Sequence, residues 1–231
     1  MDRNLIFILL LFAVMFAAVF VYHFFKVKSY LSKLKDYAYA NNLKLTKKPE
    51  KNVKFQLTGV TNKHPWVFKC LIEKPEGFAG INPTGANAEI ASYFLFSAPG
   101  IKINNMFIIG KSDMMNAQDV EFDKNVVSFF LKNVLGEATA AKLKDIKQID
   151  FGKTDAFKFQ YMTLAHEKAR PGDVIDEEIE EVLANQFEWV SDNDITITVL
   201  PDRMEIKADA KEDLDNIKSI VELGQKILKR V

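Results

Sequence analysis

The 231-residue chain contains one cysteine, Cys70. A single cysteine can form no disulfide within the chain and cannot supply the thiolates of a structural metal site. The sequence also has no Gly-x-Ser-x-Gly nucleophile elbow, and the stretch 82–87 (Asn-Pro-Thr-Gly-Ala-Asn) has too few glycines and no lysine for a phosphate loop. We therefore expect no cofactor, and the sequence favours a protein without catalytic activity.

Net charge is lacking as well, because 31 Lys and Arg residues balance 31 Asp and Glu residues. Without a basic excess the chain has no electrostatic attraction for nucleic acid, which we do not expect as a partner. The charge is unevenly distributed. Lysines dominate residues 26–54, whereas residues 171–192 contain carboxylates and no basic residue.

An uncharged, apolar run covers Asn4 to Phe25. As a helix, such a run is about 33 Å long and matches a hydrocarbon core of about 30 Å. The sequence therefore predicts a transmembrane helix. Ala13 and Ala17 have the spacing of small residues found in paired membrane helices, so a homodimer through this face is one alternative.

Lysines follow the apolar run closely: Lys26, Lys28, Lys33 and Lys35. Lysines flanking a span favour the cytoplasmic side and gain about 1 kcal/mol each near anionic lipid. We expect these four side chains to contact the membrane surface, with membrane lipid as a partner. The expected location is the bacterial inner membrane, in a single-pass topology with a cytoplasmic C-terminal domain.

Three segments are expected along the chain. Residues 1–25 form the anchor, 26–52 form a basic juxtamembrane helix and linker, and 53–231 form a soluble domain with a sub-boundary near 148–155. The helix after the apolar run is expected to stop at Asn41-Asn42, because Asn tolerates the left-handed conformation.

Alternating apolar residues predict strands at 53–57, 66–73, 92–98, 106–110, 157–161, 195–199 and 204–208. Spacings of three and four predict helices at 171–187 and 214–228, and residues 122–147 favour helix, with strand as the competitor over 122–136. The expected fold class is α+β: one transmembrane helix followed by an antiparallel sheet covered by helices.

The helix predicted after Pro171 is strongly acidic. Asp176, Glu177, Glu180 and Glu181 lie opposite its apolar stripe, and carboxylates near a helix N-terminus are stabilised by its dipole. We interpret these carboxylates as a solvated face that a basic partner could recognise. The alternative is a membrane-tethered enzyme with a metal or pocket between the 74–90 loop and the carboxylates of the 173–181 helix; we expect no metal site as the first interpretation.

In layout, the chain resembles uncharacterised bacterial single-pass inner-membrane proteins. The resemblance rests on the N-terminal span, the lysine-bearing helix ending near Asn41-Asn42-Leu43, and the first strand closing in Leu57-Thr58-Gly59. It implies no activity and no functional residues. The function expected from the sequence is a membrane-anchored binding or scaffold protein, an accessory subunit with protein partners in a membrane complex.

Overall fold

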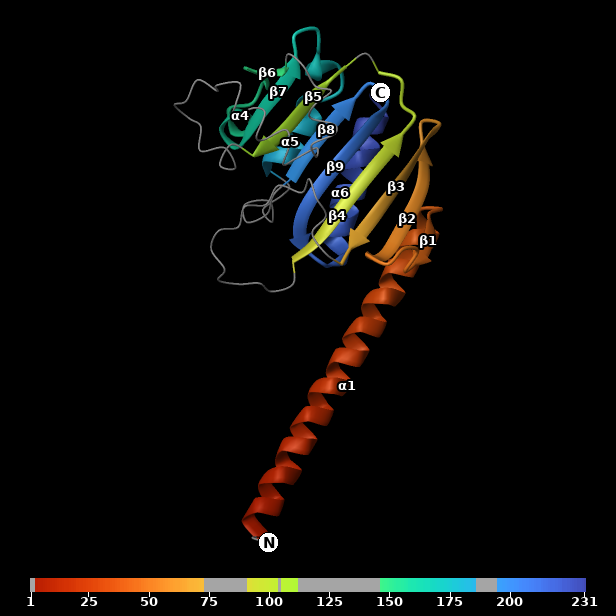
Figure 1. The fold of residues 1–231 in the computed structure, drawn as a ribbon, viewed down its shortest axis with the longest axis vertical. Helices are drawn as coiled ribbons and strands as arrows, with labels where there is room; N and C mark the ends of the chain where they lie inside the picture. The colour runs from red at the N-terminus through yellow and green to blue at the C-terminus, as the bar shows by residue number, and fades with distance from the viewer. Residues whose placement is uncertain (1–2, 73–90, 104, 112–145, 186–194) are drawn as a thin grey trace. The chain divides into compact units, whose positions relative to one another are not determined.

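The computed structural model describes residues 3–72, 91–103, 105–111, 146–185 and 195–231 (Figure 1). The chain divides into two compact units, residues 1–43 and 44–231. The second unit therefore begins at Lys44 and includes a strand that the sequence had assigned to a linker.

The first unit contains one helix, α1, which runs from Arg3 to Ala40. The side chain of Asn41 donates to the Tyr37 carbonyl at 2.9 Å, and Asn42 has a φ of 52°. The left-handed residue lets the Leu43 amide turn back to the Ala38 carbonyl at 2.8 Å. The predicted stop at Asn41-Asn42 is confirmed.

The predicted transmembrane helix is contradicted. A search of the described residues finds no helix that combines the length and the apolarity needed to cross a membrane. The apolar run is the first part of α1, which continues without a break through the lysines and Asp36 to Ala40. The inner-membrane location, the single-pass topology and the cytoplasmic placement all depended on that anchor, and they are corrected with it.

One antiparallel sheet of nine strands dominates the second unit. Its strands are β1 (Lys44–Lys47), β2 (Val53–Thr61), β3 (His64–Leu71), β4 (Ala91–Pro99), β5 (Phe107–Lys111), β6 (Ile146–Ile149), β7 (Tyr161–His166), β8 (Ile195–Leu200) and β9 (Arg203–Lys211). They lie in the order β1-β2-β3-β4-β9-β8-β5-β7-β6. The two halves of the sheet therefore meet where β4 pairs with β9 (Figure 1).

The helices described in this unit are α4 (Asp155–Gln160), the 3-10 turn η2 (Pro171–Asp173), α5 (Glu177–Asn185) and α6 (Leu214–Leu228). α4 and α5 both pack against Tyr161. The Phe157 ring of α4 stacks on the Tyr161 ring with 5.1 Å between the ring centroids, and the Tyr161 hydroxyl donates to the Leu183 carbonyl of α5 at 3.1 Å. α6 crosses β4 so closely that a Cβ on Gly224 would lie 2.6 Å from the Phe96 ring. The strand register places Tyr161 and Phe96 on the same face of the sheet.

That helix-covered face holds the core. Alternate strand residues point into it and are buried, and aromatic rings of neighbouring strands stack there, Trp66 on Phe96 at 5.1 Å and Phe68 on Phe94 at 5.5 Å. Successive side chains of a strand point to opposite faces, so the alternation of apolar residues in these strands buries large apolar side chains on one face.

The expected fold class needs correction. The second unit is mostly a large antiparallel sheet with few helices, because three strands escaped prediction. β1 had been assigned to the linker, and β6 falls at the end of the helix predicted for 122–147, whose other residues lie outside the described part. The strand predicted at 157–161 is helix α4, and the strand β7 begins only at Tyr161.

Candidate functional site

The sheet's second face carries a row of charges. Arg203, Glu205, Lys207 and Asp209 alternate along β9 with buried Met204, Ile206, Ala208 and Ala210, so all four point away from the helix-covered face. We call these four side chains the β9 row. The described helices of this unit all pack on the opposite face, and the side chains of the row are half-buried.

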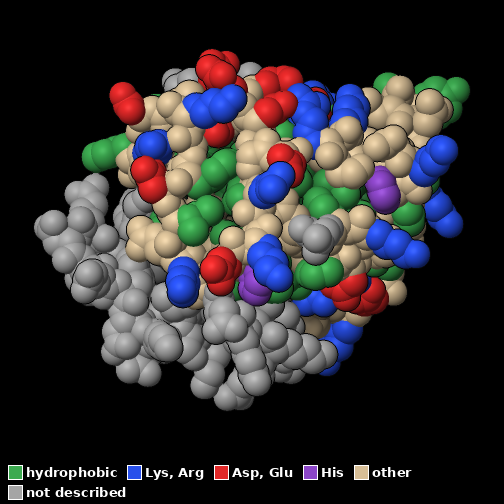
Figure 2. Space-filling view, turned by 90° about the horizontal axis from the view of Figure 1, so that it is seen from above, with side chains coloured by type: hydrophobic (Ala, Val, Ile, Leu, Met, Phe, Trp, Pro, Cys, Tyr) green, Lys and Arg blue, Asp and Glu red, His purple; other side chains and the backbone are tan. Residues whose placement is uncertain are grey.

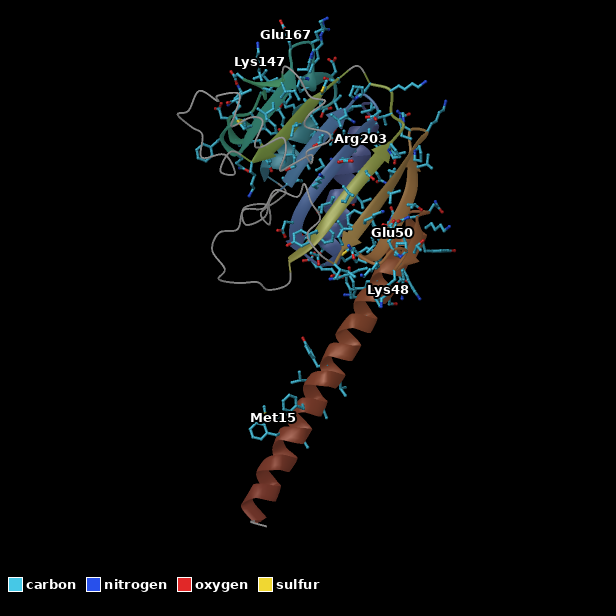
Figure 3. All side chains as sticks on the ribbon, viewed as in Figure 1. Met15, Lys48, Glu50, Lys147, Glu167 and Arg203 are labelled. Carbon is cyan, nitrogen blue, oxygen red and sulfur yellow. The ribbon has the colours of Figure 1, made fainter. Side chains whose placement is uncertain are left out.

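Neighbouring strands fix the surroundings of the row. Leu95 and Ser97 of β4 lie opposite Lys207 and Glu205, and on the other side Thr198 of β8 lies opposite Glu205. Directly opposed residues on one sheet face bring their side chains into contact range. Figure 3 labels Arg203, the first residue of the row, at the start of β9 beside β4.

Charges in the row interact along the strand. Arg203 Nε lies 3.2 Å from Glu205 Oε1, with the two side chains 33% and 21% exposed. Burial lowers the pKa of Lys207; the Glu205 carboxylate opposes this shift and the Arg203 charge adds to it. Burial, followed by the charge of Asp209, raises the pKa of Tyr93, which lies opposite Asp209 on β4. Lys207 is therefore partly desolvated, and its ionisation carries a cost.

An unsatisfied hydroxyl borders the row. Thr198 is 1% exposed, and its Oγ1 has no hydrogen-bond partner among the described residues. Farther across this face Ile108 and Leu164 are also buried, whereas Leu95 and Ser97 are half-buried. The β9 row thus lies between a buried part and a half-buried part of one face. Desolvated charges and an unsatisfied polar group cost stability, and such costs are typical of functional surfaces.

Sequence reasoning missed this row. It used Met204, Ile206 and Ala208 to predict a strand and assigned no role to the residues between them. The signal that could have found it is the alternation of sign at 203, 205, 207 and 209, which no amphipathic strand requires. The Pro201-Asp202 turn predicts a hairpin that places β8 beside β9, whereas the pairing of β4 with β9 could not be read from the chain.

The acidic helix is partly committed to internal contacts. Asp176 Oδ2 lies 2.7 Å and Glu178 Oε2 2.8 Å from Arg230 Nη2, and Lys226 Nζ lies 3.0 Å from Glu178 Oε1. Burial alone would raise the pKa of Asp176, but hydrogen bonds from Arg230 and the Ile179 amide outweigh it and hold that pKa below its usual range. Hydrogen bonds from Lys226 and Arg230 lower the pKa of Glu178.

The four predicted docking residues are therefore split. Glu180 is 1% exposed and accepts hydrogen bonds from the amides of Lys153 at 2.7 Å and Thr154 at 3.1 Å. Glu177 is exposed, 3.9 Å from Lys153 Nζ, and Glu181 is exposed. Only Glu177 and Glu181 remain available to a basic partner, whose binding there stays a prediction. Figure 2 shows the interleaved acidic and basic side chains of one end of the molecule.

The predicted lysine contacts fall on α1. Lys33 and Lys35 are exposed, while the side chains of Lys26 and Lys28 lie outside the described part. Ala17 is exposed, and the side chain of its predicted pairing neighbour Ala13 is also outside that part.

A second polar cluster surrounds the one cysteine. Glu212 Oε2 lies 2.6 Å from Lys54 Nζ and accepts from Ser92 Oγ at 3.0 Å. Burial raises the pKa of Cys70 to about 12, the charge of Glu212 adds to that, and Lys54 and Ser92 oppose it. A protonated thiol is a poor nucleophile, and an ion-paired lysine is a poor base. We therefore interpret the cluster as a structural contact that ties β2, β3 and β4 to the end of β9.

The alternative metal site gains no support. Residues 74–90 lie outside the described part of the chain, and Asp176, Glu178 and Glu180 are engaged as above. Within the described ranges, no group of three or more His, Cys, Asp and Glu side chains is arranged to hold a metal ion.

Comparisons with protein-family models, with curated proteins and with solved structures find no match to this chain.

Proposed function

We propose that the chain is a binding module that docks a protein partner on the β9 row. One observation carries the proposal: four charges of alternating sign are held half-buried on one strand, with no described helix above them. The chain's own residues partly desolvate Lys207, and the Thr198 hydroxyl has no hydrogen-bond partner in the described part of the chain; a purely solvated face requires neither.

The length of the row favours a macromolecule over a small ligand. Six residue steps along a strand, from Arg203 to Asp209, span about 20 Å. A small metabolite would cover only part of that length, whereas a strand or helix of a partner covers all of it. Alternating charges define the register of such a partner, because a shift of the partner by one charge along the row places like charges opposite one another.

Site-specific crosslinking tests the proposal. A photoreactive amino acid at Ser97, opposite Glu205, should give one discrete adduct with another protein when the full chain is illuminated in the cells that produce it. The same amino acid at Glu222, an exposed position on α6, is the matched control and should give no discrete adduct.

The double variant Glu205→Lys/Lys207→Glu keeps the total charge and reverses the local pattern. It should abolish the Ser97 adduct while leaving the melting temperature within a few degrees of the parent chain. An adduct of twice the chain's mass would make the partner a second copy. A crosslink only within the chain, or an adduct that survives the charge swap, would count against the proposal.

A further inference from the structure

Strand β1 forms one edge of the described sheet and pairs only with β2. The Lys48 amide donates to the Lys54 carbonyl at 2.9 Å, which makes this a hydrogen-bonded pair. Because such pairs alternate in an antiparallel ladder, Lys44 and Thr46 direct their backbone groups toward β2. Leu45 and Lys47 therefore direct theirs outward, away from the sheet.

The edge is short and sharply bounded. Asn42 and Lys48, with φ of 52° and 46°, leave the extended conformation on either side of β1. Two residues with outward N–H and C=O groups offer four backbone hydrogen bonds. A sheet edge with such groups can receive an extended segment as an added strand.

Positive charge surrounds this edge. Lys44, Lys47, Lys48 and Lys51 are exposed, and within the described part of the chain no carboxylate pairs with any of them. The carboxylate of the same turn is engaged elsewhere, since Glu50 Oε1 lies 2.6 Å from Lys69 Nζ. Figure 3 labels Lys48 and Glu50 beside β1 and β2.

We propose that the β1 edge binds an acidic, extended segment of a partner protein, which adds to the sheet as a further strand. The charge decides the occupant. A second copy offering the same edge would bring lysines against lysines, whereas glutamates and aspartates on an added strand would meet them as opposite charges. This surface is separate from the β9 row and does not rest on it.

Binding to a labelled synthetic peptide tests the proposal. The probe alternates glutamate with valine, and its affinity for the full chain is measured by fluorescence anisotropy at low and at high salt. The expected result is binding that weakens with salt, is lost when lysine replaces glutamate in the peptide, and falls about tenfold or more in Lys44→Glu/Lys47→Glu. The matched control Lys168→Glu/Lys229→Glu, at exposed sites distant in the sequence, should change affinity by less than about twofold.

Leu45→Pro separates strand addition from simple charge attraction. It removes an outward N–H, keeps every lysine and breaks no hydrogen bond to β2, because proline is tolerated at such edge positions. A loss of binding similar to that of the charge reversal, with an unchanged melting temperature, is expected. Full binding by Leu45→Pro, or no binding of the acidic peptide to the parent chain, would overturn the proposal. If Leu45→Pro unfolds the chain, N-methylation of alternate peptide bonds in the probe makes the same test, because it removes backbone N–H donors from the peptide instead of from β1.

Discussion

Glu180 and Glu181 are adjacent in sequence and have opposite surroundings. Glu180 is buried and accepts two backbone hydrogen bonds from the turn before α4, whereas Glu181 is exposed. Glu180→Ala should lower the free energy of unfolding by about 2–3 kcal/mol, because it removes the buried carboxylate that accepts from the amides of Lys153 and Thr154. Glu181→Ala, the matched control, should stay within about 0.5 kcal/mol.

Urea denaturation of both variants measures the difference. Equal effects of the two substitutions would show that Glu180 does not hold the turn, and the acidic helix would again be a uniformly solvated face.

Lys207 is expected to trade stability for binding. Its pKa is lowered in the folded chain, mainly by burial, so the folded protein holds this proton less tightly than the unfolded chain does. At neutral pH its charge therefore opposes folding, and stability should rise as pH increases through the lowered pKa toward the ordinary value of 10.5.

Lys207→Met should then keep or raise the free energy of unfolding at pH 7, by up to about 1 kcal/mol, and should remove the partner bound to the β9 row. Chemical denaturation at pH 7 measures the free energy of unfolding of the variant and of the parent chain. A loss of more than about 1 kcal/mol would mean that the lysine stabilises the sheet and is not kept for binding.

At the scale of elements, the contact between α5 and the end of α6 makes a pH-dependent prediction. The pKa of Asp176 is held below its ordinary value of 3.8 in the folded chain by Arg230 and the Ile179 amide against burial. The stability from this pair is therefore present above pH 3.8 and is lost as pH falls through the lowered pKa.

Arg230→Gln should lower stability at pH 7 by about 0.5–1 kcal/mol through its pair with Asp176, as is usual for partly exposed ion pairs. The difference from the parent chain should shrink as pH falls through the lowered pKa of Asp176, because the carboxylate then becomes protonated in the folded chain as well as in the unfolded one. Lys168→Gln serves as the control, since this exposed side chain has no such pair with any residue that the structure describes. Thermal unfolding across pH 2.5–7 measures both, and a pH-independent difference would refute the electrostatic explanation.

The elements also show how far sequence reasoning reaches. Regular alternation predicted β2, β8 and β9, and the final helix matches α6, because each segment has one consistently buried face. The strand predicted over Phe157 to Tyr161 failed for a physical reason. Thr154 caps a helix by accepting from the Phe157 amide at 3.3 Å, and Phe159, expected in the core, is 72% exposed. The prediction gave three aromatic residues with the period of a strand more weight than the helix-capping residue Thr154.

At the scale of the whole molecule, sequence patterns predict neighbours only for strands joined by a tight turn, such as β8 and β9. β4 pairs with β9 although the two are far apart in sequence, and this pairing places Leu95 and Ser97 against Lys207 and Glu205. The candidate site is therefore a product of topology: its charges and the hairpin partner β8 could be read from the chain, but the other flanking strand, β4, could not. The long apolar run led to an expected anchor that the described structure does not bear out.

Docking on the β9 row is tested by quantitative affinity purification of the tagged full-length chain, with mass spectrometry of the co-purifying proteins. The parent chain is compared with Glu205→Lys/Lys207→Glu. We expect one protein in stoichiometric amount with the parent chain and its loss from the charge-swapped variant, while the control Lys168→Glu/Lys229→Glu retains it. The same protein recovered equally with the charge-swapped variant, or a parent chain recovered alone, would contradict the claim that the β9 row is a protein-docking surface.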